Sequence, residues 1–474
     1  MNKSILEKCQ VFTPTKIVED LLDAVEYKKN LFGKKVIENA CGDGRILIEI
    51  VRRYITDSLD QDKSLEEIKQ GLQADIYGVE IDTSHYKSCL HNLSLVAESF
   101  KISDVVWNVF NGDILKQHSK DDFDFVIGNP PYIKYHDLDN KTRDYLRKNY
   151  DFCKRGKFDY CYAFIESSIH SLNPNGKMAY LIPNSIFKNI FAQDLRNMIL
   201  PYTTKIIDYT IQNLFDTART SSAILVCQLN SSNSTITYKN VYTDQQFPIS
   251  KSSLSQKWIF SNTNTKERSV NKQKFGYYFT AANSVATLLN EAYVLKEFIR
   301  EKDYIIVGDS KIELCLAREG VSPRSLCYNK QELILFPYKY EQDSLKKYSR
   351  EYFESNFPQA TKYLKLYSAK LEKRKSDCNT EWFEYGRSQA LAHLNQPKLL
   401  LSRVITNQVK IYELNENCIP YSGIYIIPKR ELDLKKAKDI LRSKEFYEYI
   451  NEIGINVNGG SLRITAKDIN NFRF

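Results

Sequence analysis

The sequence predicts an α/β protein: a Rossmann-like domain built on a mostly parallel twisted sheet, followed by a C-terminal mixed α+β domain. Strand-like and helix-like segments alternate through the first half, which is typical of a parallel sheet with helices on both faces. Polar residues follow several of these strands, and open α/β sheets bind ligands at that edge. The chain has 474 residues, more than one hydrophobic core usually organises, so we expect two domains.

The spacing of apolar residues locates the elements. Helical spacing predicts helices over 45–54 and 160–172, and we expect a further helix within 57–75. Runs of strand-forming residues predict strands at 34–40, 74–82, 104–115, 123–132, 177–183 and 220–229. Beyond residue 240 the periodicity is poorer, with strand-like runs at 332–338, 398–405 and 421–428.

Charge separates the two halves. Residues 241–474 hold 37 Lys and Arg against 27 Asp and Glu, whereas residues 1–240 hold 30 against 31. A near-neutral half joined to a basic half fits a catalytic domain joined to a domain that binds a polyanion, although frequent use of Lys explains the charge equally well. The polar stretch 230–240 is the predicted linker, which gives domains 1–240 and 241–474.

Composition excludes several classes of protein. No apolar run approaches the roughly 20 residues of a membrane span, and the first residues lack the apolar core of a secretory signal. The ten Cys are scattered without a C-x-x-C pair, and the chain has six His, which argues against disulfide frameworks and metal sites. We therefore expect a cytoplasmic protein with neither a membrane nor a metal partner.

A Gly-containing loop follows the first predicted strand. Gly42 and Gly44 stand between that strand and a helix, but the loop lacks the full G-x-G-x-x-G pattern of dinucleotide sites. Glu38 and Asp43 would repel a phosphate and suit a cation. By itself the loop is a weak signal for ligand binding.

Two more strands end in residues that suit a ligand. Glu80 can accept two hydrogen bonds from a ribose diol, Asp113 can accept one from an exocyclic amine, and Ile114 can pack on a base. Each acid alone is equally well explained as a surface residue at a strand end. Together with the cation-tolerant loop, however, they describe S-adenosylmethionine better than NAD.

The N-terminal segment predicts a well-started helix. Thr13 fits the N-cap and Pro14 the first helical position. Phe12 and Ile17 fit a hydrophobic staple across that cap.

The order of the motifs resembles a known family. The segments "FTP", "ENACGDG", "VEID", "NGDIL", "NPPY" and "LFDTARTSSAILV" follow one another within residues 10–229. This order is similar to that of the gamma-class amino-methylating DNA methyltransferases, whose target-recognition domain follows the catalytic domain. Members with Asn first in NPPY methylate adenine N6 as a rule, and those with Ser methylate cytosine N4.

The resemblance implies a set of site residues. The cofactor would be S-adenosyl-L-methionine, contacted by Phe12, Thr13, Glu38, Asn39, Ala40, Cys41, Gly42, Glu80, Ile81, Asp113, Ile114, Asn129, Pro131 and Phe164. The catalytic residues would be Asn129, Pro130, Pro131 and Tyr132. Tyr132 and Phe215 would stack on a target base. Phe164 and Phe215 are equally well explained as core residues.

The chemistry of adenine methylation explains the NPPY turn. The adenine amino nitrogen is a poor nucleophile because its lone pair is delocalised into the ring. The Asn129 side-chain oxygen and the Pro130 carbonyl can accept its two hydrogens and localise that lone pair, while Pro131 stiffens the turn. Tyr132 can stack on a base that has been flipped out of the duplex.

The second half would recognise double-stranded DNA. The segment 372–391 combines a basic run with aromatic residues, and "EYGRSQAL" resembles a recurring element of target-recognition domains. Lys373, Arg374 and Arg387 are the candidate DNA contacts, although basic runs are more often solvated surfaces.

The predicted function is site-specific methylation of adenine N6 in DNA, within a restriction-modification system or as an orphan methylase acting at the nucleoid. The first motif begins by residue 11 and no convincing nuclease pattern follows, so we expect methylation by this chain without cleavage, either beside a separate cognate endonuclease or without one. The alternatives are an RNA adenine, protein glutamine or cytosine-N4 methyltransferase, and a non-catalytic DNA-binding subunit.

Overall fold

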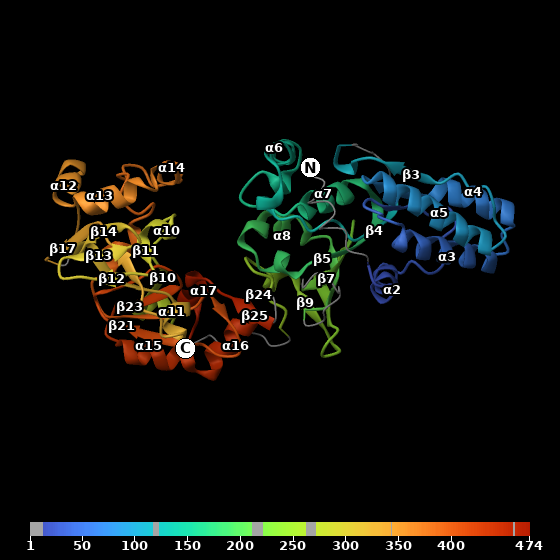
Figure 1. Cartoon of the computed structure of the whole chain (residues 1–474). Helices are drawn as coiled ribbons and strands as arrows, with labels where there is room; N and C mark the ends of the chain where they lie inside the picture. Colours follow the sequence, from blue (N-terminus) through green and yellow to red (C-terminus); the bar gives the residue numbers. More distant parts are fainter. Residues whose placement is uncertain (1–12, 117–122, 211–220, 262–271, 343, 458–459) are drawn as a thin grey trace. The chain divides into compact units, whose positions relative to one another are not determined.

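A computed structural model describes residues 13–116, 123–210, 221–261, 272–342, 344–457 and 460–474 (Figure 1). The chain divides into two compact units: Met1–Thr263 with Ile455–Gly460, and Asn264–Gly454 with Ser461–Phe474. The structure therefore differs from the predicted boundary at residue 240. The polar stretch 230–240 is not a linker, because its residues Thr235–Asn240 form strand β8, with Ile236 and Tyr238 buried in the core of the first unit.

The first unit contains a nine-stranded sheet of order β3-β2-β1-β4-β5-β7-β6-β8-β9. The first five strands of this order pair in parallel, and β7 then runs antiparallel between β5 and β6. The strands are β1 (Val36–Glu38), β2 (Ile76–Glu80), β3 (Asn108–Asn111), β4 (Phe123–Gly128), β5 (Leu172–Pro183), β6 (Thr203–Asp208), β7 (Ser222–Gln228), β8 and β9 (Gln245–Ser250). The α/β prediction is confirmed.

Helices cover both faces of this sheet, because its central strands are apolar on both sides. In β4, Val126 packs into one core cluster and Ile127 into the other, as alternation along a strand requires. The helices are α2 (Thr15–Ala24), α3 (Arg45–Asp60), α4 (Leu65–Asp75), α5 (Thr83–Ser99), α6 (Asn140–Asn149), α7 (Cys161–Ser171) and α8 (Gln193–Ile199). The helix expected within 57–75 is α4, and a capping box between Ser64 and Glu67 fixes its start.

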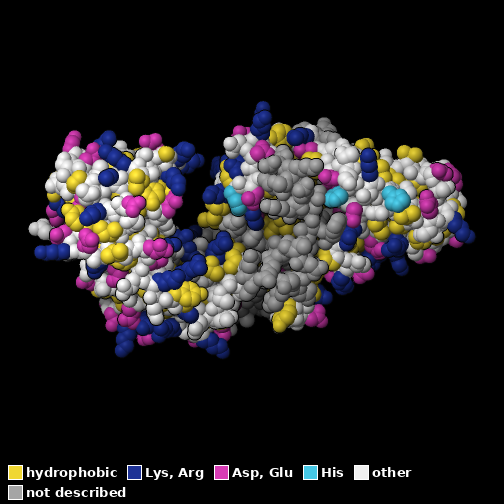
Figure 2. All heavy atoms as spheres, in the orientation of Figure 1, with side chains coloured by type: hydrophobic (Ala, Val, Ile, Leu, Met, Phe, Trp, Pro, Cys, Tyr) yellow, Lys and Arg dark blue, Asp and Glu magenta, His cyan; other side chains and the backbone are white. Residues whose placement is uncertain are grey.

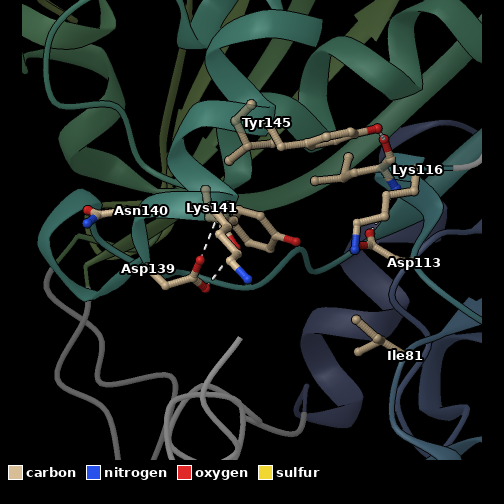
Figure 3. A pocket seen from close by; sticks show the side chains of 11 residues that line it. Ile81, Asp113, Lys116, Asp139, Asn140, Lys141 and Tyr145 are labelled. Atoms are coloured by element: carbon tan, nitrogen blue, oxygen red, sulfur yellow. Dashed lines mark hydrogen bonds and ion pairs between the residues drawn. The ribbon is translucent and has the colours of Figure 1, made fainter.

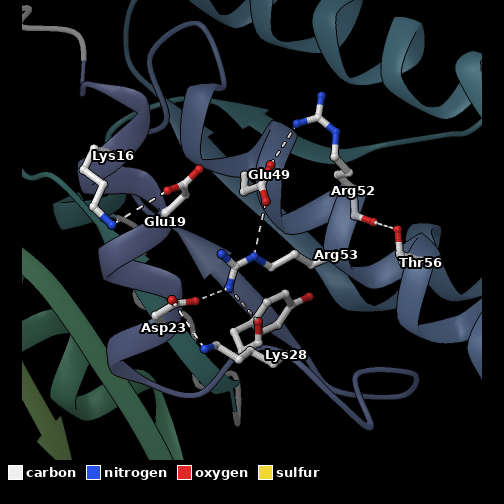
Figure 4. Close-up of polar contacts among 9 residues, drawn as sticks. Lys16, Glu19, Asp23, Lys28, Glu49, Arg52, Arg53 and Thr56 are labelled. Atoms are coloured by element: carbon white, nitrogen blue, oxygen red, sulfur yellow. Dashed lines mark hydrogen bonds and ion pairs between the residues drawn. The ribbon is translucent and has the colours of Figure 1, made fainter.

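Ion pairs hold α2 against α3 (Figure 4). The Arg53 Nη1 donates to Asp23 Oδ1 of α2 at 2.7 Å, and its Nε donates to Glu49 Oε1 at 3.2 Å. The Lys28 ammonium lies 3.4 Å from Asp23 Oδ2.

The second unit is a mixed α+β domain with small sheets, as predicted. Its strands include β10 (Phe279–Asn283), β15 (Ala317–Val321), β16 (Leu333–Leu335), β19 (Lys398–Leu401), β21 (Ile411–Leu414), β22 (Cys418–Pro420) and β23 (Ile424–Pro428). Its longer helices are α12 (Arg350–Asn356), α13 (Pro358–Lys365), α15 (Leu434–Arg442) and α16 (Lys444–Ile453). None of the helices in the described ranges is long and apolar enough to cross a membrane.

Candidate active site

The candidate site lies where the strand order of the sheet reverses. Strand β1 pairs with β2 on one side and with β4 on the other. The connections β1–β2–β3 therefore build the sheet in one direction, and the chain then returns to place β4 on the other side of β1. In open α/β sheets the crevice at such a switch point, outside the carboxyl ends of the strands, is where ligands bind. Glu38 ends β1 and Asn129 follows β4, so both lie at this crevice.

The loop after β1 leaves room for a ligand. Gly42 and Gly44 have φ of +54° and +90°, a backbone region that favours glycine. A Cβ on Gly44 would lie 2.8 Å from Cys89 Sγ, whereas a Cβ on Gly42 would meet no atom within 4 Å. Gly44 is therefore required for packing against α5, and the space beside Gly42 is open.

Glu80 at the end of β2 fixes this loop. Its Oε2 accepts the backbone N–H of Gly42 at 2.9 Å, and its Oε1 accepts that of Asp82 at 2.8 Å. Each carboxylate oxygen can accept a second hydrogen bond. The side chain can therefore hold the loop and still bind two hydroxyl groups of a ligand.

Glu38 is a buried acid that has no cationic partner among the described residues. Its exposed fraction is 2%, and its Oε2 has no hydrogen-bond partner among the described residues. Burial raises the pKa of this carboxyl well above its ordinary value, and neighbouring Cys89 adds to the rise, while a hydrogen bond from the Leu47 backbone opposes it. A nearby cationic ligand would lower the pKa of this carboxyl and stabilise its ionised form. The buried carboxyl is therefore suited to a cationic ligand.

The Asn129 amide is oriented by a contact that sequence reasoning missed. Its Nδ2 donates to the Thr13 hydroxyl at 3.2 Å. Its Oδ1 is buried and has no partner in the part of the chain that the structure describes. Buried acceptors are almost always paired, so this oxygen is available to a donor that the described residues do not supply.

The predicted cap of the first helix is wrong. Pro14 is extended (φ −60°, ψ 146°) and is itself the N-cap, and its carbonyl accepts the N–H of Ile17 at 2.9 Å. The helix therefore starts at Thr15, and the Thr13 hydroxyl is free to contact Asn129. Phe12, the other half of the predicted staple, lies outside the described residues.

The remaining residues of the turn are partly or fully enclosed. Pro130 is buried, Pro131 is half-buried, and the half-buried Tyr132 ring packs against the core cluster of α3 and α5. Burial raises the pKa of the Tyr132 hydroxyl well above its ordinary value. Stacking of Tyr132 on a base remains a prediction, and Phe215 lies outside the described residues.

A cavity of about 770 Å³ adjoins the ends of β2 and β3 (Figure 3). Figure 3 shows Ile81, Asp113 and Lys116 at one end of it and Asp139 and Asn140, at the start of α6, at the other. The Lys116 ammonium lies 3.2 Å from Asp113 Oδ2, and Asp113 Oδ1 accepts the N–H of Leu115 at 3.1 Å. Of the predicted cofactor contacts, Ile81 and Asp113 therefore line a real cavity.

Tyr160 lines this cavity and Phe164 is not part of its lining, so the contact of Phe164 with the cofactor remains a prediction. The Phe164 ring is buried and packs edge to face on Tyr160, with centroids 5.4 Å apart. The two residues lie four positions apart, or about one helical turn. This spacing in the sequence could have identified Tyr160 as a second aromatic candidate beside Phe164. Ile114 is likewise mostly buried in the core.

Asn39, Ala40 and Cys41 sit on the loop, but their side chains differ in what they can contact. The Asn39 amide donates to Ser168 Oγ at 3.0 Å and accepts from the Tyr180 hydroxyl, so its polar atoms are used inside the protein. Ala40 is half-buried and Cys41 is buried. These three residues can contribute to a ligand site chiefly through their backbone.

In the second unit, the half-buried Arg374 makes hydrogen bonds inside the protein, which argue against its predicted contact with DNA. Its guanidinium donates to the carbonyls of Thr287 at 2.8 Å, Glu384 at 3.0 Å and Trp382 at 3.1 Å. Its Nε donates to the Leu371 carbonyl at 3.2 Å. The guanidinium is thus occupied by backbone carbonyls. Lys373 and Arg387, in contrast, are exposed.

Arg387 lines a second cavity, of about 1020 Å³, within this unit. Arg403 lines it as well, and neither arginine has an ion-pair partner within the described ranges. The other polar side chains of its lining include Asn283, Asn290, Gln389 and His393, and none of the described lining residues is acidic. Figure 2 shows both Lys and Arg and Asp and Glu side chains on the visible face of this unit. The cavity is thus a local concentration of unpaired positive charge.

Among the described residues no cluster of His, Cys, Asp and Glu could hold a metal ion.

Comparison with known proteins connects these features. Residues 28–215 match the family model described as Eco57I restriction-modification methylase. The type II restriction enzyme and methyltransferase RM.Eco57I of Escherichia coli is 22% identical over 88% of this chain and 51% of its own length. The type II methyltransferase M.AccI of Acinetobacter calcoaceticus is 27% identical over 42% of each chain. The present chain thus spans about half the length of these relatives or less.

Two further matches extend over both units. The type II methyltransferase M.XhoI of Xanthomonas vasicola is 22% identical over 98% of this chain and 91% of its own. The structure of the type IIL restriction-modification enzyme MmeI in complex with DNA superposes with a TM-score of 0.61, at 14% identity, covering 99% of this chain and 67% of that one. The predicted α/β, Rossmann-like fold is confirmed.

Proposed function

We propose that this chain, whose residues 28–215 match the family model described as Eco57I restriction-modification methylase, methylates N6 of an adenine flipped out of double-stranded DNA, with S-adenosylmethionine as the methyl donor. One observation carries the proposal: the buried Asn129 Oδ1, which has no partner among the described residues, lies at the same crevice as the buried acid Glu38. The first is suited to an amino group and the second to a cation.

The residues around the crevice fit the cofactor. Glu38 has no cationic partner in the described part of the chain, Gly42 leaves open space, and Glu80 retains acceptor capacity for a ribose diol. Ile81 and Asp113, with Tyr160, would hold the adenine end in the cavity of about 770 Å³. When bound, S-adenosylmethionine supplies a methyl group activated by a sulfonium.

The turn after β4 would prepare the acceptor nitrogen. Asn129 Oδ1 and the Pro130 carbonyl accept the two amino hydrogens of the adenine, which localises the nitrogen lone pair. Thr13 holds the Asn129 amide so that its oxygen points to the substrate. The amino protons become acidic as the methyl group is transferred, so no strong base is required.

Cofactor affinity should rise with pH through the titration of Glu38. In the free protein the raised pKa keeps this carboxyl protonated above its ordinary range, whereas a bound cation favours the ionised form. The complex therefore binds fewer protons than the free protein, and the association constant increases with pH until the raised pKa is passed. Calorimetry in buffers of different ionisation enthalpy measures the released proton.

Glu38→Gln is the matched variant for that experiment. This variant should bind the cofactor more weakly than the wild type at neutral pH, and its cofactor affinity should no longer depend on pH through this group. If Glu38→Gln and the wild type show the same slope of affinity against pH, Glu38 does not contact the cationic part of the cofactor.

We further propose that the second unit, predicted as the domain 241–474, recognises the DNA target. The support is the cavity around Arg387 and Arg403, where the unpaired guanidinium groups have no acidic neighbour in the described lining. Arginine is the commonest reader of guanine in the major groove. Lys373, exposed and outside this lining, would contact phosphate.

Arg387→Ala and Arg403→Ala should each relax the target sequence at one position. An arginine that reads guanine by two hydrogen bonds contributes about 1–3 kcal/mol of discrimination. Single-molecule sequencing of DNA from cells that express each variant reports the methylated sites. Lys373→Ala should keep the wild-type motif with less complete methylation; an unchanged motif in both arginine variants would contradict their role as base readers.

The function itself is tested by tritiated methyl transfer followed by nucleoside analysis. We expect label in N6-methyladenine of duplex DNA. Label only in N4-methylcytosine, RNA or protein glutamine would reject the proposal for one of its alternatives. The same sequencing experiment identifies the target site and whether the methylase acts without a cognate endonuclease; its place at the nucleoid follows from the substrate and remains a prediction.

A further inference from the structure

Two exposed apolar side chains stand on a rigid turn of the first unit. Ile190 and Phe191, which we call the apolar turn, are 71% and 44% exposed and belong to the short 3-10 helix Ile190–Ala192. The Asn189 side chain accepts the Phe191 N–H at 3.1 Å. Leaving two adjacent apolar side chains in water is unfavourable, so the turn is a candidate contact surface.

A buried arginine holds the apolar turn in place. Arg196 is 1% exposed, and its Nη1 donates to the carbonyls of Ile186 and Asn189, each at 2.7 Å. Its Nη2 donates to Gln193 Oε1 at 3.0 Å and to the Gln256 carbonyl. Burying a guanidinium is costly unless its donors are used. Nη1 and Nη2 are used on the turn and on the chain beside it, whereas the buried Nε has no partner among the described residues. The four hydrogen bonds of Nη1 and Nη2 tie the apolar turn to the chain beside it.

The apolar turn is connected to the NPPY turn. It follows β5, the neighbour of β4 in the sheet, and packs on Gly156, where an added Cβ would lie 2.5 Å from the Phe191 ring. The chain just after Gly156 returns to the NPPY turn, because the Tyr160 N–H donates to the Ile133 carbonyl at 2.9 Å. Asp159 in the same stretch pairs with Lys134 at 2.7 Å.

Positive charge flanks the apolar turn. Gly156 lies within the exposed segment 154–157, "KRGK", which we call the basic loop. Arg147 donates to the carbonyls of Lys154 and Gly156, both at 3.1 Å, and so fixes this loop. Lys154 pairs with Asp151, whereas Arg155 and Lys157 have no ion-pair partner among the residues that the structure describes.

We propose, resting on the function proposed above, that the apolar turn inserts into the base stack of the DNA at the flipped adenine while the basic loop holds the adjacent phosphates. Flipping a base breaks its pair and its stacking, and an apolar side chain inserted between bases offsets part of that cost. The two apolar side chains suit the space between stacked bases, and the cations beside them suit the phosphates on either side of that space. A protein partner would need an apolar patch of several hundred Å².

The test compares two duplexes that carry the target site found by sequencing. One is fully paired, and the other has an abasic position opposite the target adenine, so that its flipping is already easy. The double variant Ile190→Ala/Phe191→Ala should lose about 10-fold or more in kcat/KM on the paired duplex and stay within about 3-fold of wild type on the abasic duplex. 2-Aminopurine at the target position reports flipping directly, and its fluorescence increase should shrink in the variant.

The matched control is Leu95→Ala/Val106→Ala. Both residues are exposed apolar side chains of the first unit, Leu95 in the later part of α5 and Val106 before the amino end of β3. This variant should methylate both duplexes as the wild type does. An equal loss on paired and abasic DNA in the Ile190/Phe191 variant, or no loss on either, would overturn the proposal; a wild type that methylates neither duplex would instead overturn the proposed function.

The basic loop is tested separately by salt dependence. Arg155→Ala/Lys157→Ala should reduce the slope of log affinity against log salt by about 0.9 for each phosphate that the variant no longer neutralises. An unchanged slope would show that the loop does not touch phosphate.

Discussion

An Asn129→Ala variant should lose at least about 10²-fold in methyl transfer, because mutation of a single group that stabilises developing charge has effects of that size. The variant removes the buried Oδ1, which has no partner among the described residues, and leaves the loop and the acids of the cofactor site intact. Cofactor affinity, measured by calorimetry, should therefore remain near that of the wild type. The loss should appear in kcat, since the interaction strengthens as the amino nitrogen becomes nucleophilic.

Two variants separate the role of the oxygen from that of its support. Asn129→Ser keeps an acceptor but shortens its reach, and should fall between Asn129→Ala and the wild type. Thr13→Val removes only the group that accepts from Asn129 Nδ2 at 3.2 Å, and should cost less than Asn129→Ala. Wild-type turnover by Asn129→Ala would contradict the mechanism, and an equal loss of cofactor binding would place Asn129 in the cofactor site instead.

Local sequence pattern was sufficient for the central part of the fold. The strands that end in Glu38, Glu80 and Gly128 are short apolar runs that are largely buried, and a polar residue stands at or directly after the end of each. Such segments form the same element in almost any context, because burial and turn geometry agree. Because these strands are parallel, their carboxyl ends meet at one edge of the sheet. Knowing the strands was therefore enough to predict that the polar side chains gather there.

The contacts that sequence reasoning missed are those between distant segments. Thr13 and Asn129 lie 116 positions apart, and only the packing of α2 against the sheet brings them together. Arg374 stands in a basic run, which predicts an exposed position. In the structure its guanidinium instead donates to backbone carbonyls of an irregular part of the chain. Strand β8 is polar in composition, and its membership of the sheet depends on pairing with β6 and β9.

A Glu80→Ala variant should weaken cofactor binding by about 10²–10³-fold, since hydrogen bonds to a charged group contribute about 1.5–3 kcal/mol each. The carboxylate accepts the N–H groups of Gly42 and Asp82, so its removal frees the loop that borders the open space and also removes the acceptors proposed for the ribose. Calorimetry with S-adenosylhomocysteine measures the loss without turnover.

Glu80→Gln distinguishes loop support from ribose binding. The amide retains one acceptor oxygen, which can hold either Gly42 or Asp82 but not both, so binding should be intermediate. If the loop is the main contribution, both variants should also melt earlier without cofactor, because the backbone N–H groups lose their partner. If the ribose contact dominates, the variants should melt like the wild type alone and differ only in the stabilisation that added cofactor gives. Unchanged affinity in Glu80→Ala would show that the carboxylate serves only the folded loop, and the ribose would then have to be held by other residues at the carboxyl edge of the sheet.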